Sequence, residues 1–154
     1  MDLSKLSTAD KLILGGGLAY FIFMLLPWYG LSGGSNNGWD YFLGGIIPLL
    51  LIAVMCAHIF ITNFAPDTDL PDPPVPWGQV HMIAGVAAAV ILVLRLLIGS
   101  SVDTPIGSIH LDRKFGLIFA VIAAIVVAVG GFQKSQEDPA TPSAGGSGSG
   151  SAPF

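Results

Sequence analysis

The chain alternates between long apolar runs and short polar segments. The four runs are residues Leu12–Trp28, Tyr41–Asn63, Trp77–Gly99 and Phe115–Phe132, and Arg95 is the one charged residue inside them. A helix rises about 1.5 Å per residue, so about 20 residues cross a hydrocarbon layer about 30 Å thick. The second and third runs meet that length, and the other two approach it. The pattern therefore predicts four transmembrane helices, arranged as two helical hairpins.

The apolar runs show none of the apolar–polar alternation that lipid-facing β-strands have. Lipid offers no hydrogen-bond partner to the backbone, and a helix satisfies its own backbone groups. We therefore expect an all-α integral membrane protein whose four-helix bundle covers residues 1–134. The remaining residues, 135–154, are rich in Ser, Gly and Pro and are expected to form a disordered tail.

Residues at the ends of the runs match helix ends at a membrane surface. Ser7 or Thr8 can cap the first helix, with Asp10 favourable in its first turn, and Asp112 can cap the fourth. Aromatic residues near the ends of helices favour the headgroup level of the bilayer. The expected interfacial anchors are Trp28, Tyr29, Trp39 and Trp77.

Two connecting segments differ in character. Leu31–Gly38 contains Gly, Ser and Asn and reads as a short polar turn after a first helix that closes at Pro27–Tyr29. Ala65–Pro76 contains five prolines and three aspartates, so it is expected to be extended rather than helical.

Composition agrees with a membrane protein. Apolar residues make up 53% of the chain and charged residues 10%, and the mean hydropathy is +0.74. A soluble domain carries about 25% charged residues, so the expected partner of this surface is the lipid bilayer. The few basic residues are scattered, which argues against nucleic-acid binding. Lys5 and Lys11 precede the first helix and favour cytoplasmic termini.

Arg95 is the most informative charged residue. It lies four residues before Gly99, near the end of its helix, so its side chain can reach the membrane surface. The predicted topology places Asp40 on the same side of the membrane. We expect either a structural Arg95–Asp40 pair or a site for an anionic ligand or lipid at this end.

His58 and His81 form the second candidate site. An antiparallel hairpin puts them at similar depth, and two histidines on facing helices could ligate haem b or a metal. Cys56 lies two residues from His58 and points about 200° away on a helix, so it is a poor co-ligand. The competing interpretation is a pair of histidines satisfied by backbone, water or each other. We therefore predict no cofactor, with haem b as the alternative.

Small residues recur within the helices and allow close helix packing. They serve packing within the bundle first, and contact with a second copy or a membrane partner second. The groups are Gly15–Gly17, Gly44–Gly45, Gly85–Ala89 and Gly130–Gly131.

Several short motifs follow one another in a characteristic order within residues 8–133. They are Leu26–Tyr29, Gly38–Asp40, Leu94–Ile98, Arg113–Gly116 and Gly130–Phe132. Their order resembles a family of uncharacterised four-helix membrane proteins frequent in actinobacteria. The resemblance implies a bacterial cytoplasmic membrane and supplies no activity.

No catalytic motif is present in the sequence, neither a metalloprotease helix, a nucleophile elbow nor a phosphate-binding loop. We therefore expect a non-enzymatic accessory, interaction or structural component of the membrane. One alternative is a haem- or quinone-linked redox protein that uses His58 and His81. The other is a small carrier or channel, although acidic residues are missing from all four apolar runs.

Overall fold

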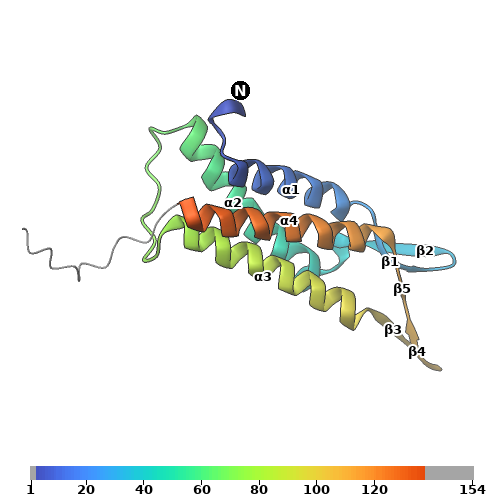
Figure 1. The fold of residues 1–154 in the computed structure, drawn as a ribbon. Coiled ribbons are helices and arrows are strands. Elements are labelled where there is room, and N and C mark those ends of the chain that lie inside the picture. Colours follow the sequence, from blue (N-terminus) through green and yellow to red (C-terminus); the bar gives the residue numbers. More distant parts are fainter. Residues whose placement is uncertain (1–2, 138–154) are drawn as a thin grey trace, which may run out of the picture.

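Four α-helices dominate the computed structural model, which describes residues 3–137 (Figure 1). They are α1 (Thr8–Met24), α2 (Ile47–Phe64), α3 (Trp77–Ile98) and α4 (Phe115–Glu137). A π-helical turn, η3 (Phe42–Ile46), leads directly into α2. Helix α4 packs against both α1 and α3, and α2 completes the bundle beside α1 and α3.

Three of the helical segments are long and apolar enough to cross a membrane: Phe42–Phe64, Trp77–Ile98 and Phe115–Glu137. Helix α1 has 17 residues and is shorter than these. The prediction of helices long and apolar enough to cross a membrane is thus confirmed for three segments. The first helix also lies earlier than predicted. It begins at Thr8 and ends at Met24, because Pro27 starts a strand instead of closing the helix.

The Ser7 cap of α1 is confirmed. The Ser7 hydroxyl accepts a hydrogen bond from the Asp10 amide, and the Asp10 carboxylate accepts one from the Ser7 amide. This reciprocal arrangement satisfies two backbone donors that a helix start leaves without partners.

The prediction of an all-α fold is wrong, because two small antiparallel sheets lie at one end of the bundle (Figure 1). Strands β1 (Pro27–Leu31), β2 (Gly34–Asn37) and β5 (Asp112–Arg113) form one sheet in the order β2-β1-β5. Strands β3 (Ser101–Thr104) and β4 (Gly107–His110) form the other.

The segment predicted as a polar turn is therefore a hairpin. Its tight connection is possible because Gly33 has a φ of 116°, a conformation that L residues with side chains rarely adopt. Asp112 belongs to β5 and is not the cap of α4, which begins at Phe115. Residues 65–76 form no helix or strand, as their prolines predict.

Helix α4 continues to Glu137, beyond the predicted start of the tail at residue 135. The rest of the predicted tail, residues 138–154, lies outside the described residues.

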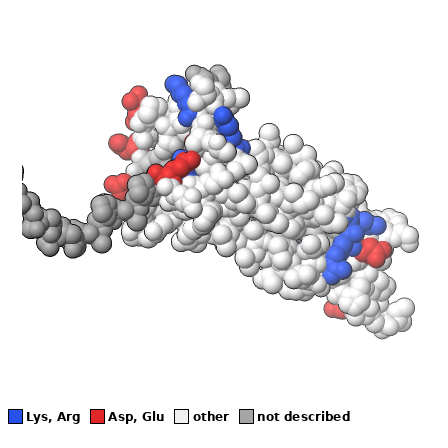
Figure 2. Space-filling view, in the orientation of Figure 1, with Lys and Arg blue, Asp and Glu red and all other residues white. Residues whose placement is uncertain are grey.

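Charged side chains gather at the two ends of the bundle and leave an uncharged band between them (Figure 2). Lys5 and Lys11 lie just before and within the first turn of α1, whereas Arg113 belongs to β5 and Lys114 follows it. An uncharged band between two charged rims suits a bundle surrounded by lipid. Together with the three span-length helices, it indicates a membrane protein.

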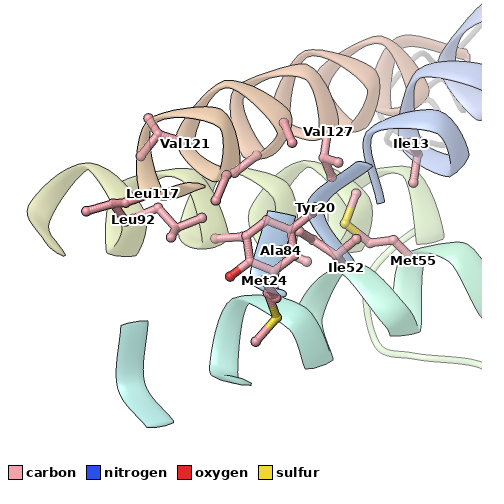
Figure 3. Close-up of a cluster of buried hydrophobic side chains, with 14 of the residues drawn as sticks. Ile13, Tyr20, Met24, Ile52, Met55, Ala84, Leu92, Leu117, Val121 and Val127 are labelled. Atoms are coloured by element: carbon pink, nitrogen blue, oxygen red, sulfur yellow. The ribbon is translucent and has the colours of Figure 1, made fainter. Parts of the chain in front are cut away.

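Apolar side chains from all four helices meet in the core (Figure 3). Glycines allow the helices to approach closely, as predicted. A Cβ on Gly16 would lie 2.7 Å from the Val127 side chain, and one on Gly85 would lie 3.0 Å from Cα of Ala128. Gly131 packs directly against the His81 carbonyl. These contacts are all within the bundle, whereas Gly15 meets open space.

Candidate functional sites at the two ends of the bundle

The structure brings His58 and His81 together at the end of the bundle where the chain begins. His58 Nδ1 lies 2.9 Å from His81 Nε2, a hydrogen-bond distance. One nitrogen donates and the other accepts, and the tautomers decide which. His81 is fully buried and His58 nearly so, and the Trp77 ring stacks on His58 at 4.0 Å between centroids. The pair thus joins α2 to α3.

This geometry does not fit two histidines that ligate one metal ion from opposite sides, as axial haem ligands do. Metal–nitrogen bonds of about 2.0 Å on opposite sides of one ion separate the ligating nitrogens by about 4 Å. The two histidine nitrogens are 2.9 Å apart. Cys56 Sγ lies 3.7 Å from the Ile13 carbonyl of α1, which directs it away from the pair. Among residues 3–137, no group of three or more potential metal ligands forms.

The same end holds a second polar cluster that sequence reasoning missed. Lys134 Nζ on α4 lies 2.9 Å from Asp10 Oδ1 on α1, and 3.5 Å from Glu137 Oε2. The Ser7 hydroxyl donates a hydrogen bond to Glu137 Oε2 at 3.1 Å. Asp10 is buried, and Lys134 is the cation that pairs with its carboxylate. The cluster ties the start of α1 to the end of α4.

Arg95 lies at the opposite end, against aromatic rings. Its guanidinium carbon is 4.3 Å from the centroid of the Tyr41 ring and 5.3 Å from that of Tyr29. This is the geometry of a cation–π contact. Gly44 lets the side chain pass, because a Cβ there would lie 3.0 Å from Arg95 Cδ.

Arg95 and Asp40 line a common pocket of about 310 Å³, but residues 3–137 contain no ion pair between them. The Asp40 carboxylate instead accepts a hydrogen bond from the Asn37 amide at 2.8 Å. It thereby caps a short 3₁₀ turn, η2 (Gly38–Asp40). The predicted pairing partner is therefore occupied in holding the connection between β2 and η3.

The expected interfacial aromatics lie in different environments. Trp28 and Tyr29 are fully buried, since the β1–β2 hairpin folds them back onto the bundle. Trp28 Nε1 donates to the Phe23 carbonyl at 2.9 Å. Trp39 is 40% exposed, with its ring edge against Phe21. Trp77 covers the histidine pair.

The C-terminal carbonyls of α3 receive side-chain donors from the three-stranded sheet. The Tyr29 hydroxyl donates to the Arg95 carbonyl at 2.6 Å. Arg113 donates through Nε to the Leu96 carbonyl at 2.6 Å and through Nη2 to the Leu97 carbonyl at 3.0 Å. Burial raises the pKa of the Tyr29 hydroxyl, an effect that the nearby Arg95 charge partly opposes.

Chemically, the two ends hold structural pairs, and Arg95 has no carboxylate partner among residues 3–137. The similar depth of His58 and His81 could be predicted by counting residues along the α2–α3 hairpin. Arg95 could be identified because it is the one charged residue in an apolar run. The Asp10–Lys134 pair gave no local signal, because its members are far apart in the chain. Comparisons with protein-family models, with curated proteins and with solved structures found no significant match.

Proposed function

We propose that this chain is a small four-span accessory or structural protein of a bacterial cytoplasmic membrane, which acts through lateral contacts in the bilayer. The supporting observation is that buried polar side chains bond one another across helices. His58–His81 joins α2 to α3, and Asp10–Lys134 joins α1 to α4. In carriers and redox proteins such groups face a substrate path or a cofactor. Here they tie the bundle together.

Helix α1 serves as the fourth span in this proposal. Its 17 residues rise about 25 Å, which is near the lower limit for crossing a bilayer. It packs along α4, which is itself long enough to span. The lysines Lys5 and Lys11 before and within its first turn favour cytoplasmic termini. The resemblance to the actinobacterial membrane family is consistent with this topology.

The outer face of α3 and α4 is the surface proposed for the lateral contact. Two neighbouring apolar pockets, of about 360 and 390 Å³, share Val86 and Val90 as lining residues. Ile125, Val129 and Phe132 of α4 add exposed apolar surface beside them. A helix from a second copy or from another membrane protein fits such a hollowed apolar face better than a smooth one.

Cysteine labelling tests the topology. In a chain with Cys56 replaced by Ala, single cysteines at Ser4 and Asp69 are expected to react with an impermeant reagent from one side only. Cysteines at Ser35 and Ile106 are expected to react from the other side, because the hairpins lie at the opposite end. Labelling of Ser4 and Ser35 from the same side would show that α1 does not cross.

Photo-crosslinking in native membranes tests the lateral contact. A photoreactive residue at Val90, inside the pockets, is expected to give a protein adduct of defined mass. The matched control is Leu50, which is also exposed and apolar but lies on α2. Lipid adducts alone at both positions would contradict an accessory role that depends on this face. Equal protein adducts at both would show that the face is not preferred.

A further inference from the structure

The charge of Arg95 is not neutralised by the described part of the chain. No carboxylate of residues 3–137 lies within ion-pair distance of its guanidinium. Its Nη2 donates one long hydrogen bond, 3.4 Å, to the Ser100 hydroxyl, and its buried Nε has no hydrogen-bond partner there. An arginine carries five N–H donors, so most of its capacity is unused by protein acceptors. Cation–π contacts with Tyr41 and Tyr29 offset only part of the cost of holding this charge beside lipid.

A polar pocket opens at this guanidinium. It has a volume of about 310 Å³, and its lining residues include Arg95, Ser100, Ser101 and His110. No acidic residue lines it, in contrast to the neighbouring pocket that contains Asp40. Hydroxyl groups beside a guanidinium are suitable donors for a phosphate group. The Arg113 guanidinium lies next to Gly99 of the same pocket and adds positive charge.

An apolar groove continues from the same arginine toward the middle of the bundle. It has a volume of about 290 Å³ and lies between η3 and α3, with Leu43 and Gly44 on one side. On the other side are Ile91, Leu94 and Ile98, whose spacing puts them on one stripe of α3. Arg95 therefore stands where a polar pocket for an anion meets a groove for a hydrocarbon chain.

We propose that this site binds a phospholipid. Its phosphate group lies on Arg95, Ser100 and Ser101, and one acyl chain lies in the groove between η3 and α3. Two features support a lipid over a free anion: the polar pocket is continuous with the apolar groove through Arg95, and the site is at the end of a span-length helix. The proposal does not depend on the partner contact proposed for the outer face of α3 and α4.

Native mass spectrometry of the full chain, stripped of lipid in detergent, tests the site. The probe is phosphatidylglycerol with palmitoyl and oleoyl chains, compared with the diacylglycerol that has the same chains and no phosphate. We expect the diacylglycerol to bind at least about tenfold more weakly, since it lacks the charge-assisted hydrogen bonds. Inorganic phosphate is expected not to displace phosphatidylglycerol. Equal binding of both lipids would overturn the proposal, and displacement by inorganic phosphate would reassign the site to a free anion.

Three variants locate the binding. Arg95→Gln is expected to weaken phosphatidylglycerol binding about tenfold or more. Lys11→Gln is the charge-matched control at the opposite end and should bind like the native chain. The double variant Ser100→Ala/Ser101→Ala keeps Arg95 on its aromatic rings, and we expect it to bind about fivefold more weakly. It keeps the test decisive if Arg95→Gln does not fold. Native-like binding by this double variant and by folded Arg95→Gln would overturn the proposal.

Discussion

Tyr29 and Arg113 lie directly opposite each other in the pairing of β1 with β5, and both side chains bond the last carbonyls of α3. The final carbonyls of a helix have no partner within the helix, and Leu96 and Leu97 are among them. The Arg95 carbonyl also accepts from the Gly99 amide at 3.1 Å, so Tyr29 gives it a second hydrogen bond. Such groups are costly to leave unsatisfied wherever water is excluded. The three-stranded sheet therefore acts as a cap that reaches α3 from strands adjacent to α1 and α4.

Removing donors from this cap is expected to destabilise the bundle. Tyr29→Phe should lower the free energy of unfolding in detergent by about 1 kcal/mol, the usual value of one hydrogen bond. Arg113→Gln removes two charge-assisted bonds and should cost about 2 kcal/mol or more. Ser108→Ala, at an exposed position of β4, is the control and should change stability by less than about 0.5 kcal/mol. Equal effects at all three positions would contradict the cap.

The Tyr29 hydroxyl predicts a pH dependence of the free energy of unfolding. Burial raises the pKa of Tyr29 above its usual value of about 10, so the folded state favours the neutral phenol. The stabilisation is present in full below the pKa of the unfolded chain and is lost as pH rises through the higher folded pKa. Thermal unfolding from pH 8 upward should therefore show a decline beginning near about pH 10. Tyr29→Phe should decline less steeply, and an identical profile for both proteins would contradict this origin.

The ion pair between Asp10 and Lys134 predicts unequal single substitutions. Lys134→Met leaves the buried Asp10 carboxylate without its cation and should cost about 3 kcal/mol of unfolding free energy. Asp10→Asn should cost less, because Lys134 keeps Glu137 as a partner at 3.5 Å. The double variant should recover part of the loss, because no buried charge is then left alone. A double-mutant cycle by chemical unfolding measures the coupling, and strictly additive losses would contradict it.

The two glycines Gly131 and Gly15 form a matched test of helix packing. A methyl group on Gly131 would overlap the His81 carbonyl, so Gly131→Ala should force α3 and α4 apart and cost about 1–3 kcal/mol. Gly15 has open space at the Cβ position, and Gly15→Ala should be neutral or stabilise α1 by up to about 1 kcal/mol. Thermal unfolding of both variants checks the difference in sign.

The histidine pair predicts a colourless protein. Because His58 and His81 bond each other at 2.9 Å, we expect no Soret band in oxidised or dithionite-reduced samples purified from cells supplied with haem. A band at near-stoichiometric occupancy that disappears in both His58→Ala and His81→Ala would contradict this expectation. That result would favour the redox alternative for the chain.

The sequence indicated the helices better than the segments between them. A run without charge is visible over about 20 residues, so the positions of α2, α3 and α4 followed from length alone. Strand β5 has two residues, and β2 is composed of Gly, Ser and Asn, so neither shows a readable alternation. Their pairing depends on β1, which lies far from β5 in the chain.

The candidate sites also differ in how well the sequence predicted them. His58 and His81 are joined by one hairpin, so counting residues from its connection placed them at one depth. The Asp10–Lys134 pair depends on how α1 and α4 are rotated about their axes, which periodicity did not reveal in helices apolar on nearly every side. The role of Asp40 depended on the turn after β2, where the Asn37 backbone amide donates a hydrogen bond to the Asp40 carboxylate.

The contacts between α1 and α4 also constrain the order in which the bundle folds during synthesis. During synthesis α1 and β1 are made before α4 and β5. Asp10 therefore lacks its Lys134 partner, and β1 lacks its pairing with β5, until the later residues have been made. A nascent chain that still lacks α4 has an unpaired carboxylate at the start of its first helix. Helix α4 is made after α1, α2 and α3, and its contacts with α1 and α3 therefore complete the packing of the bundle.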